Sequence, residues 1–176
     1  RRRHPGLRIS VVGDGWWSPR LQAVADALGV SDIVDFHGFV DEKTKHRVYA
    51  SSWVLALPSL KEGWGIVVME AATHAVPSVA YRQAGGVAES IVHGETGMLV
   101  DGEVEDYASM LGELLDDAAL RARLGGQARS RAEEFTWAAT AKAFAAVLSD
   151  VSTRVSRVRV VPAPSGHVEH HVETTI

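Results

Sequence analysis

The sequence has 176 residues, a length typical of one domain, and 46% of them are hydrophobic, so a sizeable core can form. The formal net charge of -4 gives no general electrostatic case for nucleic-acid binding. The lack of cysteine excludes disulfides, thiolate catalysis and cysteine metal sites, and it fits a reducing compartment. No apolar run approaches the roughly 20 residues of a membrane-spanning helix, and no secretory signal is present, so we expect a cytoplasmic protein. Because the sequence does not begin with Met, we expect a fragment or a trimmed chain.

Short apolar runs alternate with helical patterns along the chain. The runs predict strands over residues 7–12, 33–37, 53–57, 78–81 and 98–100. The helical patterns cover residues 21–28, 43–51, 66–74, 87–92, 105–115, 119–134 and 137–148. This alternation predicts a Rossmann-like α/β domain with a mostly parallel sheet flanked by helices. We expect the domain to span residues 7–151 and a flexible tail to follow over 152–176.

The loop after the third predicted strand is the most informative segment, because ligands in such folds bind where strands end. It contains two glycines and leads into a helix, whose first turn offers free N–H groups and a positive dipole end. That combination suits a phosphate group or sugar hydroxyls. Glu70 follows four apolar residues of this helix, and a carboxylate there needs hydrogen-bond donors, which two ribose hydroxyls would supply. Glu62, in the loop, is placed to accept hydrogen bonds from a hexose.

A capping box gives a different interpretation of the same residues. Ser59, Leu60, Lys61 and Glu62 match its pattern, which would make Glu62 a helix cap and Glu70 a solvated residue. Two glycines would then interrupt a helix that begins at Leu60, so the ligand-binding interpretation is favoured.

The spacing of these residues resembles a known family. Residues 62–65 (EGWG), with Glu70 eight positions after Glu62, resemble the E-x7-E signature of family 4 glycosyltransferases, which have the GT-B fold. Further segments follow in the family's order, and together they extend the resemblance over about residues 7 to 148. These segments are residues 12–15, 36–40, 77–80, 85–89, 94–100, 116–125 and 135–137.

The resemblance implies the C-terminal, donor-binding half of a retaining hexosyltransferase that binds a nucleoside-diphosphate sugar, with Glu62 as its catalytic residue. It implies no metal and no other cofactor, and it implies an acceptor-binding N-terminal GT-B domain as partner. Neither the base, the sugar nor the acceptor follows from it. The implied donor-binding residues are Glu62, Gly63, Trp64, Gly65, Ile66, Glu70, Gly13, Gly15, Gly38, Val40 and Lys45.

The sequence departs from the family in two respects. The family's C-terminal domain opens with a central strand and a loop that carries an Arg and a Lys for the diphosphate, and this strand and loop are absent here. The remaining strands must therefore close the gap or leave an unpaired seam. Ala75 stands where the family has a helix-ending glycine, and a left-handed cap there would cost about 1 kcal/mol. We expect this chain alone to be inactive in sugar transfer.

Three other functions remain open. The first is a non-catalytic nucleotide-sugar-binding module. The second is a GT-B-fold sugar epimerase, against which the spacing of Glu62 and Glu70 argues. The third is a dinucleotide-dependent oxidoreductase. Its fingerprint is incomplete here, because Ser18 replaces the third glycine and Asp35 does not stand clearly at the end of a strand.

Several other residues permit a functional or a structural interpretation. Gly85 and Gly86 could bind an anion or make a tight turn. Histidines 167, 170 and 171 could hold a metal, although a solvated tail is favoured because no ordered scaffold fixes them. Arginines 154, 157 and 159 alternate with valines, which suits an edge strand, a mobile tail or peripheral contact with the inner face of an anionic membrane.

Overall fold

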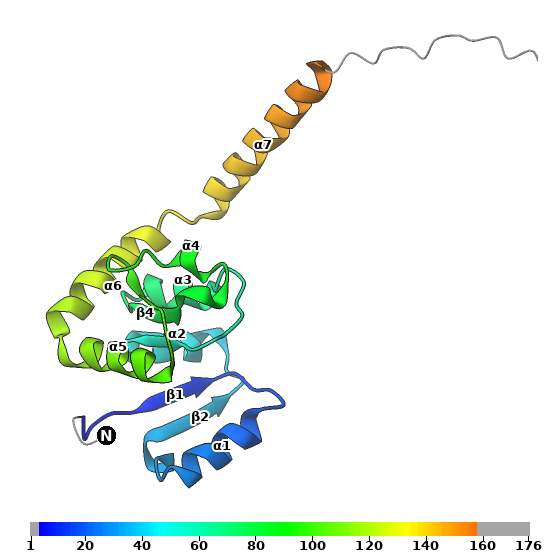
Figure 1. Cartoon of the computed structure of the whole chain (residues 1–176). Coiled ribbons are helices and arrows are strands. Elements are labelled where there is room, and N and C mark those ends of the chain that lie inside the picture. Colours follow the sequence, from blue (N-terminus) through cyan, green and yellow to red (C-terminus); the bar gives the residue numbers. More distant parts are fainter. Residues whose placement is uncertain (1–3, 158–176) are drawn as a thin grey trace, which may run out of the picture. The chain divides into compact units, whose positions relative to one another are not determined.

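The computed structural model describes residues 4–157 of the chain. It divides into two compact units, residues 1–134 and residues 135–176 (Figure 1). All the described strands belong to the first unit, and the described part of the second is a single helix, α7.

The strands of unit 1 form two separate parallel sheets. One sheet has the order β1-β2, and the other has the order β3-β4-β5. Each strand pairs in parallel with its neighbour, as crossover connections through helices require. The strands are β1 (Ile9–Val12), β2 (Val34–Gly38), β3 (Leu55–Leu57), β4 (Ser78–Tyr81) and β5 (Gly97–Val100).

Helices connect the strands, and the strand-helix alternation predicted from the sequence is confirmed. The ends of the elements differ from the predicted ones by one to three residues in most cases, because turns and caps set them. Two short 3-10 turns, Ser31–Ile33 and Arg82–Ala84, complete unit 1. The helices are α1 (Ser18–Ala27), α2 (Glu42–Ser51), α3 (Ile66–Thr73), α4 (Val87–Ser90), α5 (Val104–Asp116), α6 (Ala118–Ala132) and α7 (Trp137–Arg157).

The predicted end of the last helix at residue 148 is wrong, because α7 continues to Arg157. No glycine or proline interrupts residues 149–157, and an ion pair of 2.9 Å between Asp150 and Arg154 lies one turn apart on its surface. The predicted domain boundary at residue 151 therefore falls inside a helix. Of the flexible tail predicted over 152–176, residues 152–157 belong to α7, and residues 158–176, with Arg159 and the three histidines, lie outside the described residues. No helix within residues 4–157 has the length and hydropathy that crossing a bilayer requires.

The core of unit 1 surrounds the three-stranded sheet. Residues of β4 and β5 are almost fully buried against α3, α4, α5 and α6. The buried Tyr107 hydroxyl of α5 donates a hydrogen bond of 2.8 Å to the carbonyl oxygen of Val79, which ties this helix to the central strand. The largest fully buried side chains of this core are Ile91, Leu114, Leu124, Val79 and Val87.

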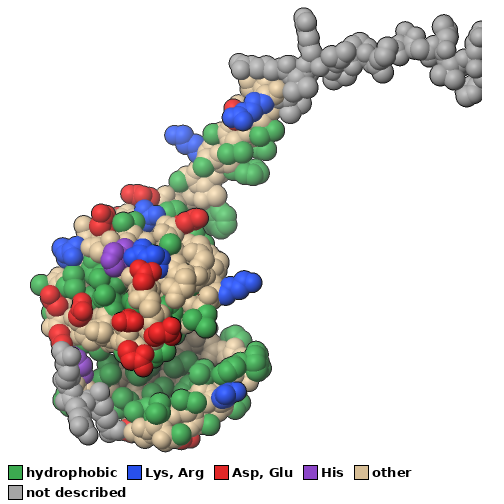
Figure 2. All heavy atoms as spheres, viewed as in Figure 1, with side chains coloured by type: hydrophobic (Ala, Val, Ile, Leu, Met, Phe, Trp, Pro, Cys, Tyr) green, Lys and Arg blue, Asp and Glu red, His purple; other side chains and the backbone are tan. Residues whose placement is uncertain are grey.

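The sheet of β1 and β2 lies outside this core. Ile9 and Val12 of β1 are 42% and 39% exposed, although they belong to an apolar strand. Hydrophobic side chains also gather on the surface over β1, β2 and α1 (Figure 2). No described strand pairs β1 with β3, so the strands leave an unpaired seam rather than closing the gap. This is one of the two outcomes expected from the sequence.

Candidate functional site

The glycine loop after β3 leads directly into α3. Gly65 is the N-cap of this helix and has a left-handed backbone with φ of 76°. Its carbonyl oxygen accepts the first helical hydrogen bond, from the Val68 N–H at 2.9 Å. A residue with a β-carbon would be strained in this conformation, so the glycine allows the sharp turn into the helix. Because α3 begins at Ile66, the capping-box interpretation of Ser59 to Glu62 is wrong.

A second glycine pair, Gly85 and Gly86, packs against this loop. The Glu62 N–H donates to the Ala84 carbonyl oxygen at 2.6 Å, and Glu62 forms a bridge with Gly85. A β-carbon on Gly85 would lie 2.6 Å from the Glu62 carbonyl oxygen, and one on Gly86 would lie 2.7 Å from that of Gly63. These two glycines therefore allow close packing of two loops, which accounts for them without an anion.

The side chain of Glu62 remains within its own loop. One carboxylate oxygen accepts a hydrogen bond of 3.1 Å from the Gly63 N–H, and the residue is half-buried. Ile66, the first residue of α3, is 70% exposed. The carboxylate of Glu62 therefore lies in the loop between β3 and α3.

Glu70 is the centre of the best-defined polar cluster near the loop. Its Oε1 accepts a hydrogen bond of 2.8 Å from Lys45 Nζ, and its Oε2 accepts one of 3.0 Å from the Tyr49 hydroxyl. Lys45 also forms an ion pair of 2.9 Å with Glu42 on its own helix. The side chains of Lys45 and Glu70 are only 22% and 27% exposed, so this is a partly buried carboxylate and not a solvated one.

Both donors of this cluster are protonated at neutral pH, and their environment raises the pKa of each further. The hydrogen bond to Glu70, followed by the one to Glu42, holds the pKa of Lys45 above its ordinary value. Burial, together with the bond to Glu70, raises the pKa of the Tyr49 hydroxyl. Lys45 is one of the residues implied to bind the donor, and in the structure its ammonium group contacts the carboxylates of Glu42 and Glu70. Sequence reasoning missed Tyr49, which lies one turn after Lys45 on the same face of α2.

The loops after β1 and β2 meet at two glycines. The Gly13 N–H donates to the Gly38 carbonyl oxygen at 2.8 Å, and both residues have positive φ, 107° and 62°. Gly15 N–H donates to the Asp14 carboxylate at 2.7 Å, and hydrogen bonds from Ser18 and Gly15 hold the pKa of Asp14 below its ordinary value. Val40, half-buried, follows in the loop before α2. The structure thus groups Gly13 with Gly38, and Lys45 with Glu70.

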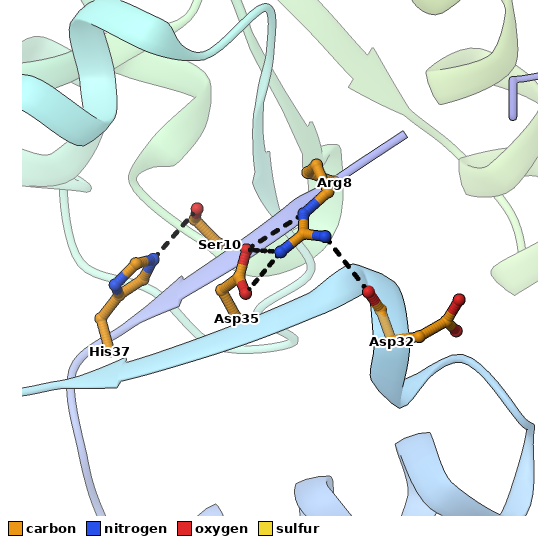
Figure 3. Close-up of polar contacts among 5 residues, drawn as sticks. All are labelled: Arg8, Ser10, Asp32, Asp35 and His37. Carbon is orange, nitrogen blue, oxygen red and sulfur yellow. Dashed lines mark hydrogen bonds and ion pairs between the residues drawn. The ribbon is translucent and has the colours of Figure 1, made fainter. Parts of the chain in front are cut away.

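The carboxylate of Asp35 is not free, because it is paired with Arg8. It lies near the start of β2, opposite Ser10, and its carboxylate accepts two hydrogen bonds of 2.8 Å from Arg8 (Figure 3). The ribose-binding acid of a dinucleotide site stands instead near the end of a strand. This position further weakens the oxidoreductase interpretation.

Among residues 4–157 no group of three or more His, Cys, Asp or Glu side chains is arranged to hold a metal ion. His46 and His74 lie 2.8 Å apart as an exposed hydrogen-bonded pair, on α2 and at the end of α3.

Comparison with solved structures supports the fold. Sucrose-phosphate synthase of Thermosynechococcus elongatus superimposes with a TM-score of 0.75 at 24% identity, over 86% of this chain and 40% of that one. HepE of Anabaena, solved in complex with UDP-glucose, gives a TM-score of 0.73 at 27% identity, over 83% of this chain and 42% of that one. The predicted Rossmann-like fold of a GT-B half is confirmed.

Sequence comparison identifies the family. The D-inositol 3-phosphate glycosyltransferase of Corynebacterium jeikeium is 37% identical over 149 residues, which cover 80% of this chain. The chain spans about a third of the length of such curated relatives and matches their C-terminal portion. The family model for glycosyl transferases group 1 matches residues 1–131. With the strand-helix order and the glycine loop already described, this match shows that the chain belongs to the glycosyl transferases group 1 family.

Proposed function

We propose that this chain is the donor-binding half of a retaining family 4 glycosyltransferase and holds a nucleoside-diphosphate sugar at the ends of β1, β2 and β3. The observation that carries the proposal is the partly buried Glu70 carboxylate, oriented by Lys45 and Tyr49 beside the start of α3. A preoriented carboxylate of this kind suits the two hydroxyls of a ribose.

The beginning of α3 is the proposed diphosphate site. Its first N–H groups have no partners within the helix, and the positive end of the helix dipole favours a negative charge. Gly65 has no side chain to cover these groups. Glu62 is proposed to contact the hexose, and the loop from Gly38 to Val40 is proposed to border the base. Transfer would leave a diphosphate, whose charge the same N–H groups would stabilise.

Known relatives suggest the substrates to test first. HepE binds UDP-glucose, which makes a UDP-sugar the leading donor candidate. The curated relatives are named for D-inositol 3-phosphate, which makes an inositol phosphate the leading acceptor candidate. Because those relatives are about three times as long as the matched region, we propose that an additional N-terminal domain holds the acceptor. We propose a cytoplasmic location.

A binding titration tests the donor-site proposal. The 176-residue chain is labelled with nitrogen-15, and its amide spectrum is recorded during addition of UDP, GDP or ADP, with Mg²⁺ and with a chelator instead. We expect weak binding, equal in both conditions, with the largest shifts at the start of α3, because helix N–H groups and not a metal hold the phosphates. Binding that appears only with Mg²⁺ would contradict the metal-free site.

The same chain also permits an assay for chemistry. It is incubated with UDP-glucose and an inositol phosphate, and products are separated by mass spectrometry. We expect neither transfer nor epimerisation by this chain alone, because transfer requires donor and acceptor to be held in one geometry. An epimerised sugar would favour the epimerase alternative, and efficient transfer would contradict the half-enzyme proposal.

A further inference from the structure

Glu70 receives one hydrogen bond on each carboxylate oxygen from α2. Lys45 donates to Oε1 and the Tyr49 hydroxyl donates to Oε2. An ionised carboxylate offers about four acceptor positions. About two positions therefore remain, which equals the number of hydroxyls on the 2′ and 3′ carbons of a ribose.

The two donors differ in how precisely they can orient the carboxylate. Lys45 ends in a compact charge on a flexible four-carbon stem, and it is shared between Glu70 and Glu42. Tyr49 is a rigid ring, and it stacks against His74 with centroids 6.1 Å apart and planes 22° apart. A stacked aromatic ring has few conformations, so its hydroxyl fixes a direction better than an ammonium group does.

We propose that Tyr49 is a positioning residue, whose hydroxyl fixes the Glu70 carboxylate so that its free lone pairs face the hydroxyls of a nucleotide ribose. This inference rests on the proposed function and deepens it. Tyr49 acts through Glu70 and does not itself need to touch the ligand. Its hydroxyl is protonated at neutral pH and can donate, and burial raises its pKa further.

The experiment compares two ligands that differ by one hydroxyl, uridine diphosphate and 2′-deoxyuridine diphosphate. Affinities of the 176-residue chain are measured by amide-shift titration for wild type, Tyr49→Phe, Glu70→Gln and the double variant. We expect wild type to prefer the ribonucleotide by about tenfold, the usual scale of one hydrogen bond to a charged group. Tyr49→Phe is expected to reduce that preference to about threefold, and Glu70→Gln to abolish it. The double variant is expected to behave like Glu70→Gln.

A matched control separates positioning from simple tethering of α2 to α3. His46→Ala removes the other hydrogen bond between these elements, the one to His74, and leaves both bonds to Glu70 in place. We expect it to retain the wild-type preference for the ribonucleotide. An equal loss in His46→Ala and Tyr49→Phe would overturn the role of the hydroxyl, because release of His74, which also stacks on Tyr49, would then be sufficient.

Failure of the proposed function has a different signature. If wild type binds neither ligand, the donor site is wrong and the inference falls with it. If wild type binds both ligands equally, Glu70 does not hold the 2′-hydroxyl of the ribose, which overturns the inference while nucleotide binding by the chain still supports the donor site. If wild type discriminates and Tyr49→Phe discriminates equally well, Glu70 retains its role and only the positioning role of Tyr49 is overturned.

Discussion

Ala75 has a backbone conformation that glycine usually provides. Among the described residues it is the one non-glycine with positive φ, at 57°. It follows the C-cap of α3, and two hydrogen bonds complete a Schellman motif there: Ala75 N–H to the Ala72 oxygen and Val76 N–H to the Ala71 oxygen. The left-handed cap inferred from the sequence is confirmed, and such a conformation generally costs an alanine about 1 kcal/mol.

Ala75→Gly is expected to stabilise the protein, because it removes this strain. We predict that the free energy of unfolding rises by about 1 kcal/mol, measured by urea denaturation. Ala122→Gly, at an exposed position inside α6, is the matched control and should lower it by about the same amount. A loss of stability in both variants would show that the cap carries no strain.

Glu62 and Glu70 are expected to divide their roles between sugar and nucleotide. We predict that Glu70→Gln weakens binding of both UDP and UDP-glucose by roughly tenfold or more, because it removes a charged acceptor from the ribose. Glu62→Gln should lower the affinity for UDP-glucose and leave the affinity for UDP unchanged, because it affects only the contact with the glucose. Affinities of both ligands for both variants check this division. An unchanged affinity of Glu70→Gln for UDP would remove Glu70 from the site.

At the scale of elements, α6 packs on α3 through a glycine. Gly125 is buried in α6, and a methyl group there would overlap the Ala75 carbonyl oxygen. The adjacent Gly126 is exposed, and a methyl group there would meet nothing within 4 Å. Close packing of the two helices supports α3, on which the proposed site depends.

Alanine substitution is expected to have opposite effects on stability at these two neighbouring glycines. Gly125→Ala should lower the free energy of unfolding by about 2 kcal/mol, because the backbone must move to accept the methyl group. Gly126→Ala should raise it by up to about 1 kcal/mol, since alanine is the better helix former and has free space. Thermal or urea unfolding of the two variants checks both, and similar effects of the two would contradict this packing.

At the scale of unit 1, the strands form two sheets, and neither β1 nor β3 has a strand partner on its second edge among the described residues. The three-stranded sheet has a buried core, whereas β1 and α1 expose large hydrophobic residues such as Ile9, Leu21 and Val24. An unpaired edge leaves backbone N–H and C=O groups without partners in the sheet. The weak burial of β1 accompanies its unpaired edge, since no strand of the described residues joins β1 to β3.

Hydrogen exchange should reveal this seam. We predict that about half of the backbone amides in β1 and β3 exchange as fast as those of exposed loops, because alternate N–H groups of an edge strand point away from its partner. Those of β4, paired on both sides, should be protected. Exchange measured by mass spectrometry or NMR checks this contrast. Equal protection of β1, β3 and β4 would mean that another segment covers the open edges.

The sequence by itself determined the features that depend on local patterns. Strand-helix alternation predicted the parallel α/β fold, and the spacing of Glu62, the loop glycines and Glu70 located the candidate site. The substitution of Ala75 predicted a strained cap. Each of these follows from residues within about one or two turns of each other, where backbone conformation and periodicity are encoded directly.

The tertiary structure decided what depends on packing between distant segments. Tyr49 and Lys45 meet Glu70 across 21 and 25 residues of sequence, which no local pattern encodes. The structural role of Gly85 and Gly86 also depends on a distant segment, because their backbone packs against the loop that contains Glu62. The separation into two sheets also required the structure. Each strand can pair with several strands that lie far away in the sequence, and only the folded chain shows which edges remain unpaired.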